Sequence, residues 1–208
     1  MTADATATPF DAIAAAYDED DFHRVVAERL VTGIPAPRAD LVVDVATGTG
    51  SAAFAALEHL RPRRVVAVDL SSAMVASAVA KAASLDPAGV VEWSVGNAVP
   101  APVADGTADV VLCASSLHFL GAAAFTDWLR ILRPGGVVAF SVPSAEVFSP
   151  SPAFAELVAD DIALPTDVAG ATRLAEAAGF VRVSATEVRI VTDRTRVAFL
   201  VHAEAPSR

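Results

Sequence analysis

The stretch LVVDVATGTGSAA, residues 41–53, decides the fold of this chain. An apolar run rich in valine passes directly into Gly48-Thr49-Gly50 and then into alanines. This order predicts a strand, a tight turn and the start of a helix, because glycine adopts backbone conformations that other residues avoid. At such a turn a small ligand can approach the backbone closely, outside the carboxyl end of the strand.

A second apolar run, RVVAVDL at residues 64–70, places Asp69 nineteen residues after Gly50. Asp69 ends the expected strand, where its carboxylate can accept hydrogen bonds from both hydroxyls of a ribose. The glycine turn and Asp69 together predict a nucleoside-binding site.

Length and charge limit what surrounds this site. A chain of 208 residues is the size of one domain, so residues 1–208 are expected to form a single cofactor-binding domain. The formal net charge of −10 disfavours a nucleic acid or an anionic membrane surface as partner. Acidic residues and histidines do not cluster at ligand spacings, so no metal site is expected. We therefore expect a small-molecule substrate.

The single cysteine, Cys113, lies in the apolar run ADVVLCA and is expected in the core. The amino terminus has no basic and apolar leader pattern, and no apolar stretch reaches roughly 18 residues. These features predict a soluble, cytoplasmic protein.

The hydrophobic pattern alternates between strands and helices on both sides of residues 41–53. Continuous apolar runs predict parallel strands buried on both faces, hence a doubly wound, mostly parallel α/β sheet of the Rossmann-like type. Arg133-Pro134-Gly135-Gly136 is interpreted as the stop signal of a helix. The expected strands are 41–45, 65–69, 90–95, 109–114 and 137–142, and the expected helices are 22–30, 50–60, 72–84 and 122–132.

The two ends of the chain complete this plan. Residues 1–38 are expected to contribute N-terminal helices, and the proline-rich residues 143–166 a short lid with a helical candidate at 153–161. A capped helix over 167–178 precedes two long strands, 181–190 and 194–203, joined by Thr192-Asp193. This antiparallel hairpin would bring the sheet to seven strands.

The glycine spacing alone leaves two ligand classes open. Gly48, Gly50 and Ala53 satisfy the G-x-G-x-x-A spacing of dinucleotide-binding proteins, so an NAD-dependent oxidoreductase is one alternative. Against it, the chain has no Tyr-x-x-x-Lys pair, and Lys81 is its only lysine.

Three further segments carry a resemblance to a known family. They are VDVATGTG with Asp44, residues 96–120 (GNAVPAPVADGTADVVLCASSLHFL), and LRPGG at 132–136. In this order and spacing, over about residues 9–142, the chain resembles class I S-adenosylmethionine (SAM)-dependent methyltransferases. It is most similar in kind to those that methylate quinone precursors and natural products.

The resemblance implies that SAM is the cofactor and suggests which residues hold it. The turn Ala46, Thr47, Gly48 and Gly50 would lie against the methionine part, which Asp44 helps to hold. Asp69 would bind the ribose.

For the adenine, the resemblance implies contacts from Leu70 and Ala98. The position of Asn97 usually carries an aspartate that accepts from the adenine amino group, and asparagine keeps a carbonyl acceptor but loses the charge. Ser115 would present a hydroxyl to the ligand.

Methyl transfer from a sulfonium needs alignment more than acid–base chemistry, so no single catalytic residue is obligatory. His118, just after the expected strand 109–114, is the candidate base, with packing on the next helix as the alternative. Tyr17 and His23, in PFDAIAAAYDEDDFH, would close over the methionine end and the acceptor, as that segment does in similar enzymes.

The expected function is SAM-dependent methyl transfer to a small molecule, with the acceptor atom (O, N or C) open. The alternative within the family is a protein that binds SAM without methyl transfer, as a regulatory subunit or a SAM-assisted cyclase. The brief lid leaves the acceptor pocket open or completed by another subunit, so a homodimer is a further alternative.

Overall fold

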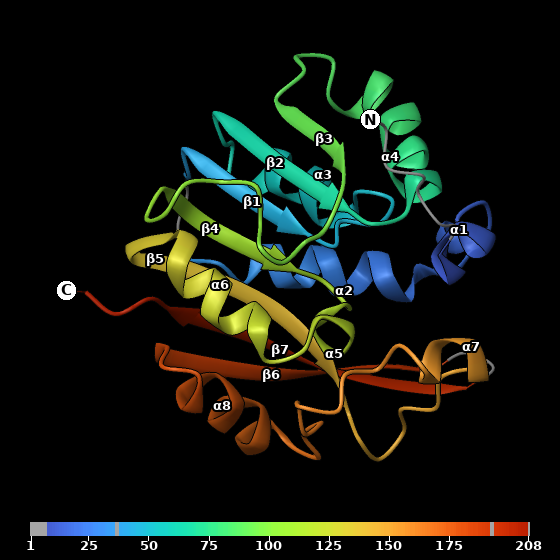
Figure 1. The fold of residues 1–208 in the computed structure, drawn as a ribbon, viewed down its shortest axis with the longest axis vertical. Coiled ribbons are helices and arrows are strands. Elements are labelled where there is room, and N and C mark those ends of the chain that lie inside the picture. The colour runs from blue at the N-terminus through green and yellow to red at the C-terminus, as the bar shows by residue number, and fades with distance from the viewer. Residues whose placement is uncertain (1–7, 36–37, 192–193, 208) are drawn as a thin grey trace.

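The sheet at the centre of the computed structural model contains seven strands (Figure 1). The structure describes residues 8–35, 38–191 and 194–207. The strands follow the order β3-β2-β1-β4-β5-β7-β6. Their bounds are β1 Leu41–Val45, β2 Arg64–Asp69, β3 Val91–Val95, β4 Ala108–Cys113, β5 Leu132–Pro143, β6 Val181–Val191 and β7 Thr195–Glu204.

Strand directions confirm the doubly wound plan with a C-terminal antiparallel hairpin. The first five strands pair in parallel, whereas β7 runs antiparallel to both β5 and β6. The chain moves outward from β1 through β2 to β3, and then returns to place β4 on the other side of β1. This reversal opens a crevice at the carboxyl ends of β1 and β4, the place where open α/β sheets bind ligands.

Helices cover both faces of the sheet. Helices α2 (Asp21–Thr32) and α3 (Ser51–His59) cover one face, and α6 (Ala123–Ile131) and α8 (Val168–Ala177) cover the other (Figure 1). Helix α4 (Ser72–Leu85) packs against β2 and β3. Alternate residues of each strand face opposite layers, which explains why the strands are continuously apolar.

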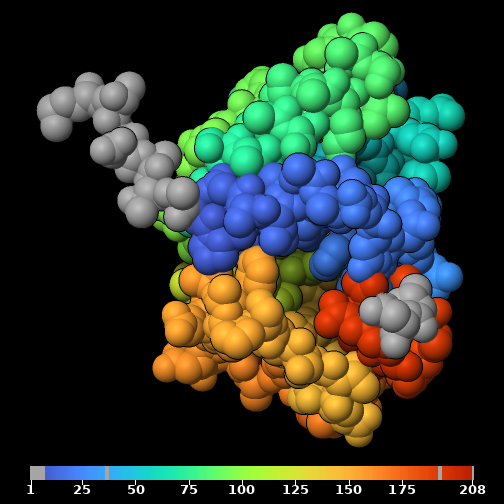
Figure 2. Space-filling model, turned by 90° about the vertical axis from the view of Figure 1, so that its right-hand side faces the viewer, coloured from blue at the N-terminus to red at the C-terminus, as the bar shows by residue number. Residues whose placement is uncertain are grey.

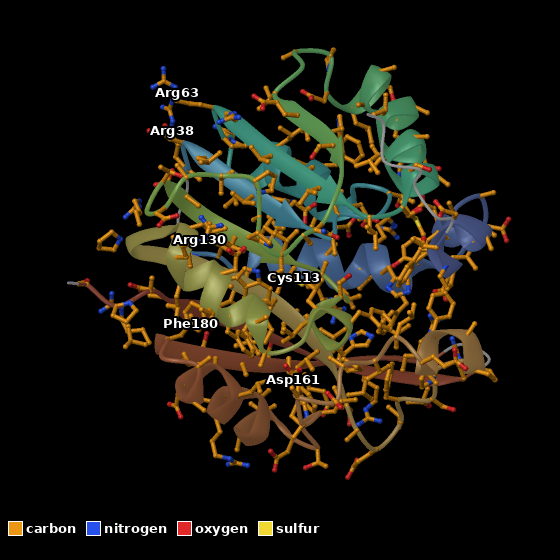
Figure 3. The ribbon with its side chains drawn as sticks, viewed as in Figure 1. Arg38, Arg63, Cys113, Arg130, Asp161 and Phe180 are labelled. Carbon is orange, nitrogen blue, oxygen red and sulfur yellow. The ribbon has the colours of Figure 1, made fainter. Side chains whose placement is uncertain are left out.

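The layer that includes α6 is rich in aromatic side chains. Trp128 is fully buried, and its ring centroid lies 5.4 Å from that of Phe125 and 5.7 Å from that of Phe140. Cys113 lies in the middle of the sheet, as Figure 3 shows, and is buried, as expected. Burial raises the pKa of its thiol, so it stays protonated as a small apolar core residue.

Two sequence predictions about local structure were wrong. The helix before Arg133-Pro134-Gly135-Gly136 does end there, at Ile131, but the expected start of the next strand at 137 is wrong, because β5 already begins at Leu132 and runs through the segment. The Gly135 amide donates to the Ala205 carbonyl and the Ala205 amide donates to the Gly136 carbonyl. These bonds prolong the ladder with the C-terminal strand.

The helical candidate at 153–161 forms only α7, Pro152–Ala155. Beyond it, the Leu157 and Val158 amides bond three residues back, and the Ala159 amide donates to the carbonyl of His118, which turns the chain away. The short helix α5, Leu117–Leu120, was not predicted. Thr192-Asp193 lies outside the described residues.

The remaining short elements lie near the N-terminus. They are α1 (Pro9–Ile13) and the 3₁₀-helix η1 (Tyr17–Glu19), which precede α2. None of the helices described is both long and apolar enough to cross a membrane.

Candidate functional site

The glycine loop, residues 46–50, connects β1 to α3. It holds left-handed backbone at Ala46, Gly48 and Gly50, with φ of 53°, 57° and 89°. A Cβ at Gly50 would lie 2.7 Å from Cη2 of Trp93 and 2.8 Å from Cε2 of Phe54, whereas one at Gly48 would meet nothing within 4 Å. Gly50 is therefore required by packing, and Gly48 faces open space that a ligand can use.

Asp44, on β1 beneath this loop, is buried and only half satisfied. Its Oδ2 accepts a hydrogen bond of 2.5 Å from the Thr47 hydroxyl, while its Oδ1 has no partner among the described residues. Burial raises the pKa of the carboxyl to about 7, against the opposing effects of Thr47 and the Ala53 amide. An unpaired buried carboxylate oxygen is suited to an ammonium group, such as the one at the methionine end of SAM.

Asp69, at the end of β2, links the glycine loop to the residue that precedes α4. Its Oδ2 accepts the Gly48 amide at 2.7 Å, and its Oδ1 accepts the Ser71 amide at 2.8 Å. Burial raises its pKa, partly offset by these amides. Because each carboxylate oxygen can accept two hydrogen bonds, both retain capacity for a ribose hydroxyl.

The predicted adenine contacts lie at the next strand ends. The Leu70 side chain is 55% exposed, Asn97 is exposed, and Ala98 is buried. The Gly96 amide donates to the Asp69 carbonyl, so the turn after β3 is fixed beside the end of β2. A large exposed leucine beside a polar turn is suited to a flat, partly apolar group.

An N-terminal segment, residues 8–23, lies across these loops and was not predicted to bind them so directly. Asp11 accepts hydrogen bonds from the Ser71 hydroxyl at 2.6 Å and the Ala73 amide at 3.1 Å. Asp18 accepts from the Thr49 hydroxyl at 2.6 Å and pairs with Lys81 at 2.8 Å. Partners 31 to 63 positions apart carry no periodic signal in a sequence.

A cavity of about 540 Å³, here called the aromatic pocket, opens beyond the end of β4. Its walls come from the N-terminal segment, the start of α5, residues 143–154 and the start of β7. Figure 2 shows the surface hollowed between the blue N-terminal segment, the orange residues around α7 and the red end of the hairpin. The aromatic residues that line the pocket are Phe10, Tyr17, Phe22, Phe119, Phe148 and Phe154.

The three candidate catalytic residues, Tyr17, His23 and His118, all line this pocket. The Tyr17 and His23 rings stack with centroids 4.7 Å apart. His118 is 5% exposed and packs edge-on to Phe148 at 4.9 Å. His118 therefore both packs against an aromatic side chain and lines the pocket.

Burial sets the protonation of these groups. It lowers the pKa of both His23 and His118 to about 4, so both imidazoles are neutral near pH 7. Neither Nδ1 has a partner among the described residues. Burial, reinforced by Asp69, raises the pKa of Tyr17, which keeps its phenolic proton. Of these three side chains, the two imidazoles can therefore accept a proton and the phenol can donate a hydrogen bond.

Ser115 connects the aromatic pocket to β4. It follows Cys113 with a left-handed φ of 62°, and its amide donates to the Ser141 hydroxyl at 2.7 Å. Both serines line the pocket.

The other histidines lie apart from this cluster. His59 ends α3, and His202 on β7 lies 2.7 Å through Nε2 from the Leu30 carbonyl. Over the described part of the chain, no three acidic, histidine or cysteine side chains gather where they could hold a metal ion.

Comparison with known proteins finds relatives in sequence and in fold. Residues 42–136 match the family described as a methyltransferase domain. The malonyl-[acyl-carrier protein] O-methyltransferase of Marinomonas sp. (strain MWYL1) is 35% identical over 143 residues, covering 65% of this chain and 50% of that protein. The chain spans about half the length of the curated relatives it matches.

Solved structures share nearly the whole fold. A chain in the complex between the Haloferax volcanii Trm112 methyltransferase activator and a methyltransferase superposes with a TM-score of 0.76, at 22% identity. The match spans 97% of this chain and 99% of the chain in that complex. A SAM-dependent methyltransferase from Aquifex aeolicus gives 0.69 at 20% identity, covering 94% of this chain and 98% of its own. Residues 42–136 match a methyltransferase domain, and the relatives and the shared fold support a place for the chain among the class I SAM-dependent methyltransferases.

Proposed function

We propose that this protein transfers the methyl group of SAM to a small-molecule acceptor bound in the aromatic pocket. The observation that carries the proposal is that the aromatic pocket lies next to the glycine loop. Ser115 and Tyr17 line the pocket, and Asp18, next to Tyr17, accepts a hydrogen bond of 2.6 Å from Thr49 of the glycine loop. A pocket of about 540 Å³ is within the usual range for small ligands.

The residues present fit the cofactor. The unpaired Oδ1 of Asp44 would receive the ammonium, the open face of Gly48 would accommodate the chain of the cofactor, and Asp69 would accept the ribose hydroxyls. Leu70 and Asn97 would flank the adenine. When bound, SAM supplies a methyl group on a positively charged sulfur.

The reaction is an in-line displacement. A lone pair on the acceptor forms the new bond to the methyl carbon, and the pair of the S–CH₃ bond returns to sulfur, which yields S-adenosylhomocysteine. If the acceptor atom carries a proton, that proton leaves to a base. The aromatic walls hold the acceptor in one orientation and exclude water.

His118 is the base that we propose for a hydroxyl or ammonium acceptor. Its imidazole is neutral near pH 7. Its Nδ1 has no hydrogen-bond partner among the described residues, so this atom can accept a proton. Tyr17 and His23 form a stacked wall that positions the acceptor.

Relatives named for ubiquinone and menaquinone biosynthesis and for nocamycin methylation support a small acceptor. The single cysteine, Cys113, is buried and unpaired, which supports a reducing, cytoplasmic setting. The acceptor class would be of the kind found in natural-product or quinone pathways. Residues 143–166 would act as a short lid over it, since several of them line the pocket.

Parallel calorimetric titrations with SAM, S-adenosylhomocysteine and NADH test the proposal first. We expect micromolar binding of the first two and none of NADH. Incubation with pooled small acceptors should then convert SAM to S-adenosylhomocysteine. NADH binding alone would refute the proposal. SAM binding without turnover across a broad acceptor panel would favour the alternative in which SAM is bound but not consumed.

Asp69→Asn is the diagnostic variant, and Asp86→Asn is its matched control. Asp86 is also buried and also accepts two backbone amides, those of Val90 and Val91, but at the far end of the sheet. Both variants should lose similar stability, whereas only Asp69→Asn should weaken S-adenosylhomocysteine binding, by about 100-fold.

A further inference from the structure

Two arginines at the start of β7 face the aromatic pocket. Arg194 and Arg196 are the only residues with full charges in a described lining otherwise made of aromatic, aliphatic, hydroxyl and neutral imidazole side chains. Arg194 is exposed, whereas Arg196 is largely buried, and a charge is costly to bury without partners.

Arg196 is held in place with one donor unused. Its guanidinium forms an ion pair with Asp20 and lies 4.7 Å from the centroid of the Phe22 ring. The side chain is only 16% exposed, and its buried Nε has no partner among the described residues. A ligand oxygen is one group that could satisfy this N–H.

The charge balance at this end of the pocket is positive. Burial opposes ionisation of Asp20, but the Phe22 amide and Arg196 outweigh it and lower its pKa, so Asp20 is an anion. Among the described residues, Asp20 offsets Arg196 and Lys81 offsets Asp18, so the positive charge of Arg194 remains. Burial lowers the pKa of His23 and Asp20 opposes this, while Arg196 and Arg194 add to the lowering. Both arginines line the pocket together with His23.

We infer that the acceptor is a largely apolar or aromatic molecule with a carboxylate, and that Arg196 and Arg194 hold this carboxylate as an anchor. This inference rests on the proposed function and specifies its substrate class. A single net positive charge matches a monoanion better than a phosphate dianion, and a guanidinium presents paired donors to a carboxylate.

The anchored carboxylate is not the methyl acceptor. Hydrogen bonds from two guanidinium groups withdraw electron density from its lone pairs and lower its nucleophilicity. Methyl transfer therefore goes to a second atom of the same molecule, which faces His118 and Tyr17, and the carboxylate leaves unmodified.

Matched probes of one shape test the anchor. 2-Naphthoate, 2-naphthamide and 2-naphthylphosphonate are titrated into the protein with and without saturating S-adenosylhomocysteine, with binding followed by ligand-observed NMR. We expect naphthoate to bind about tenfold more tightly than the amide and more tightly than the phosphonate. Equal binding of naphthoate and amide, or tighter binding of the phosphonate, would overturn the carboxylate assignment.

Substitutions of the two arginines test whether they cause the tighter binding of naphthoate than of naphthamide. Arg196→Gln and Arg194→Gln should each reduce it to about threefold or less, and Arg196→Lys should retain part of it. Arg189→Gln, on β6 of the same hairpin and paired with Glu187, should leave it unchanged. If Arg196→Gln fails to fold, Asp20→Asn/Arg196→Gln removes the ion pair as a unit. A preference that survives both glutamine variants refutes the anchor.

S-adenosylhomocysteine affinity on the same samples separates the two proposals. Its absence would refute the cofactor role of the glycine loop, whereas intact cofactor binding without carboxylate preference would refute only the anchor. Once an acceptor has been found, a reaction product that carries the new methyl group on its carboxylate would also overturn the anchoring role.

Discussion

The Thr49 hydroxyl donates a hydrogen bond to Oδ1 of Asp18 across 2.6 Å, and so joins the glycine loop to the N-terminal segment. The other oxygen of Asp18 pairs with Lys81 of α4. One carboxylate thereby fastens η1 to the beginning of α3 and to α4.

We expect Asp18→Asn to weaken S-adenosylhomocysteine binding by about tenfold, since it replaces a charged hydrogen bond and removes an ion pair that hold the segment over the loop. Calorimetry measures the affinity. Asp21→Asn, which removes only an exposed contact with Arg24, is the control and should bind like the wild type. Equal affinities in both variants would show that docking of the segment does not contribute.

Gly48→Ala should weaken cofactor binding more than it lowers stability. The left-handed φ of 57° costs an alanine about 1 kcal/mol, and its methyl group would extend into the open space assigned to the cofactor. Gly89→Ala, with φ of 66° and equally open surroundings far from the loop, carries the same backbone cost. Thermal melts should therefore agree, while S-adenosylhomocysteine affinity should fall at least about tenfold only for Gly48→Ala. Matching affinities would contradict the assignment of that space.

Gly50→Ala should instead lower stability, by about 2–4 kcal/mol, because its methyl group overlaps Trp93 and Phe54 at a φ of 89°. Denaturant unfolding measures the loss. A Trp93→Leu background should recover part of it by making room, and an unchanged loss there would mean that backbone strain or the contact with Phe54 is responsible.

Asp44 gives the ligand-free protein a defined pH dependence. Its pKa is about 7 when folded, against an ordinary value of 3.8, so the unfolded chain loses this proton first as the pH rises. The contribution of Asp44 therefore destabilises the protein progressively between about pH 4 and pH 7, and the full penalty persists above.

Asp44→Asn should consequently stabilise the ligand-free protein at pH 8 by about 2–4 kcal/mol and flatten its stability between pH 5 and 8. The same variant should bind S-adenosylhomocysteine more weakly, because the ammonium loses its anionic partner. Chemical unfolding at several pH values, paired with calorimetry, checks both signs. A variant less stable than the wild type at pH 8 would disprove the buried-charge argument.

The His118→Asn variant tests whether His118 acts as the catalytic base or only packs against its neighbours. For a hydroxyl acceptor, kcat should fall by about 100-fold with little change in KM, and the wild-type kcat should decline only below about pH 5 as the imidazole protonates. A stability loss with kcat unchanged would assign His118 to packing against Phe119 and Phe148.

The cofactor side of the molecule could be largely read from the sequence, for a physical reason. Valine-rich runs buried on both faces mark β1, β2 and β4, and Asp44 and Asp69 stand out because carboxylates are rare in or beside such runs. The glycine loop is local, so its turn residues lie together in the chain. The cofactor roles of these residues remain predictions.

The acceptor side could not be read in the same way. Phe10, Phe119 and Phe154 meet within one cluster of rings although more than a hundred positions separate the first from the others. Arg196 stands in a strand pattern where an arginine would be taken for a solvent-facing residue. Only the return of β7 beside β5 brings it next to Asp20 and Phe22.

The N-terminal segment contributes to both halves within a few residues. Asp11 and Asp18 bond to the loops at the ends of β1 and β2, while Phe10, Tyr17 and His23 form pocket wall. Occupancy of one half that steadies the segment must raise affinity in the other by the same factor. We therefore expect a saturating nucleoside to tighten acceptor binding, and a saturating acceptor to tighten nucleoside binding by the same factor.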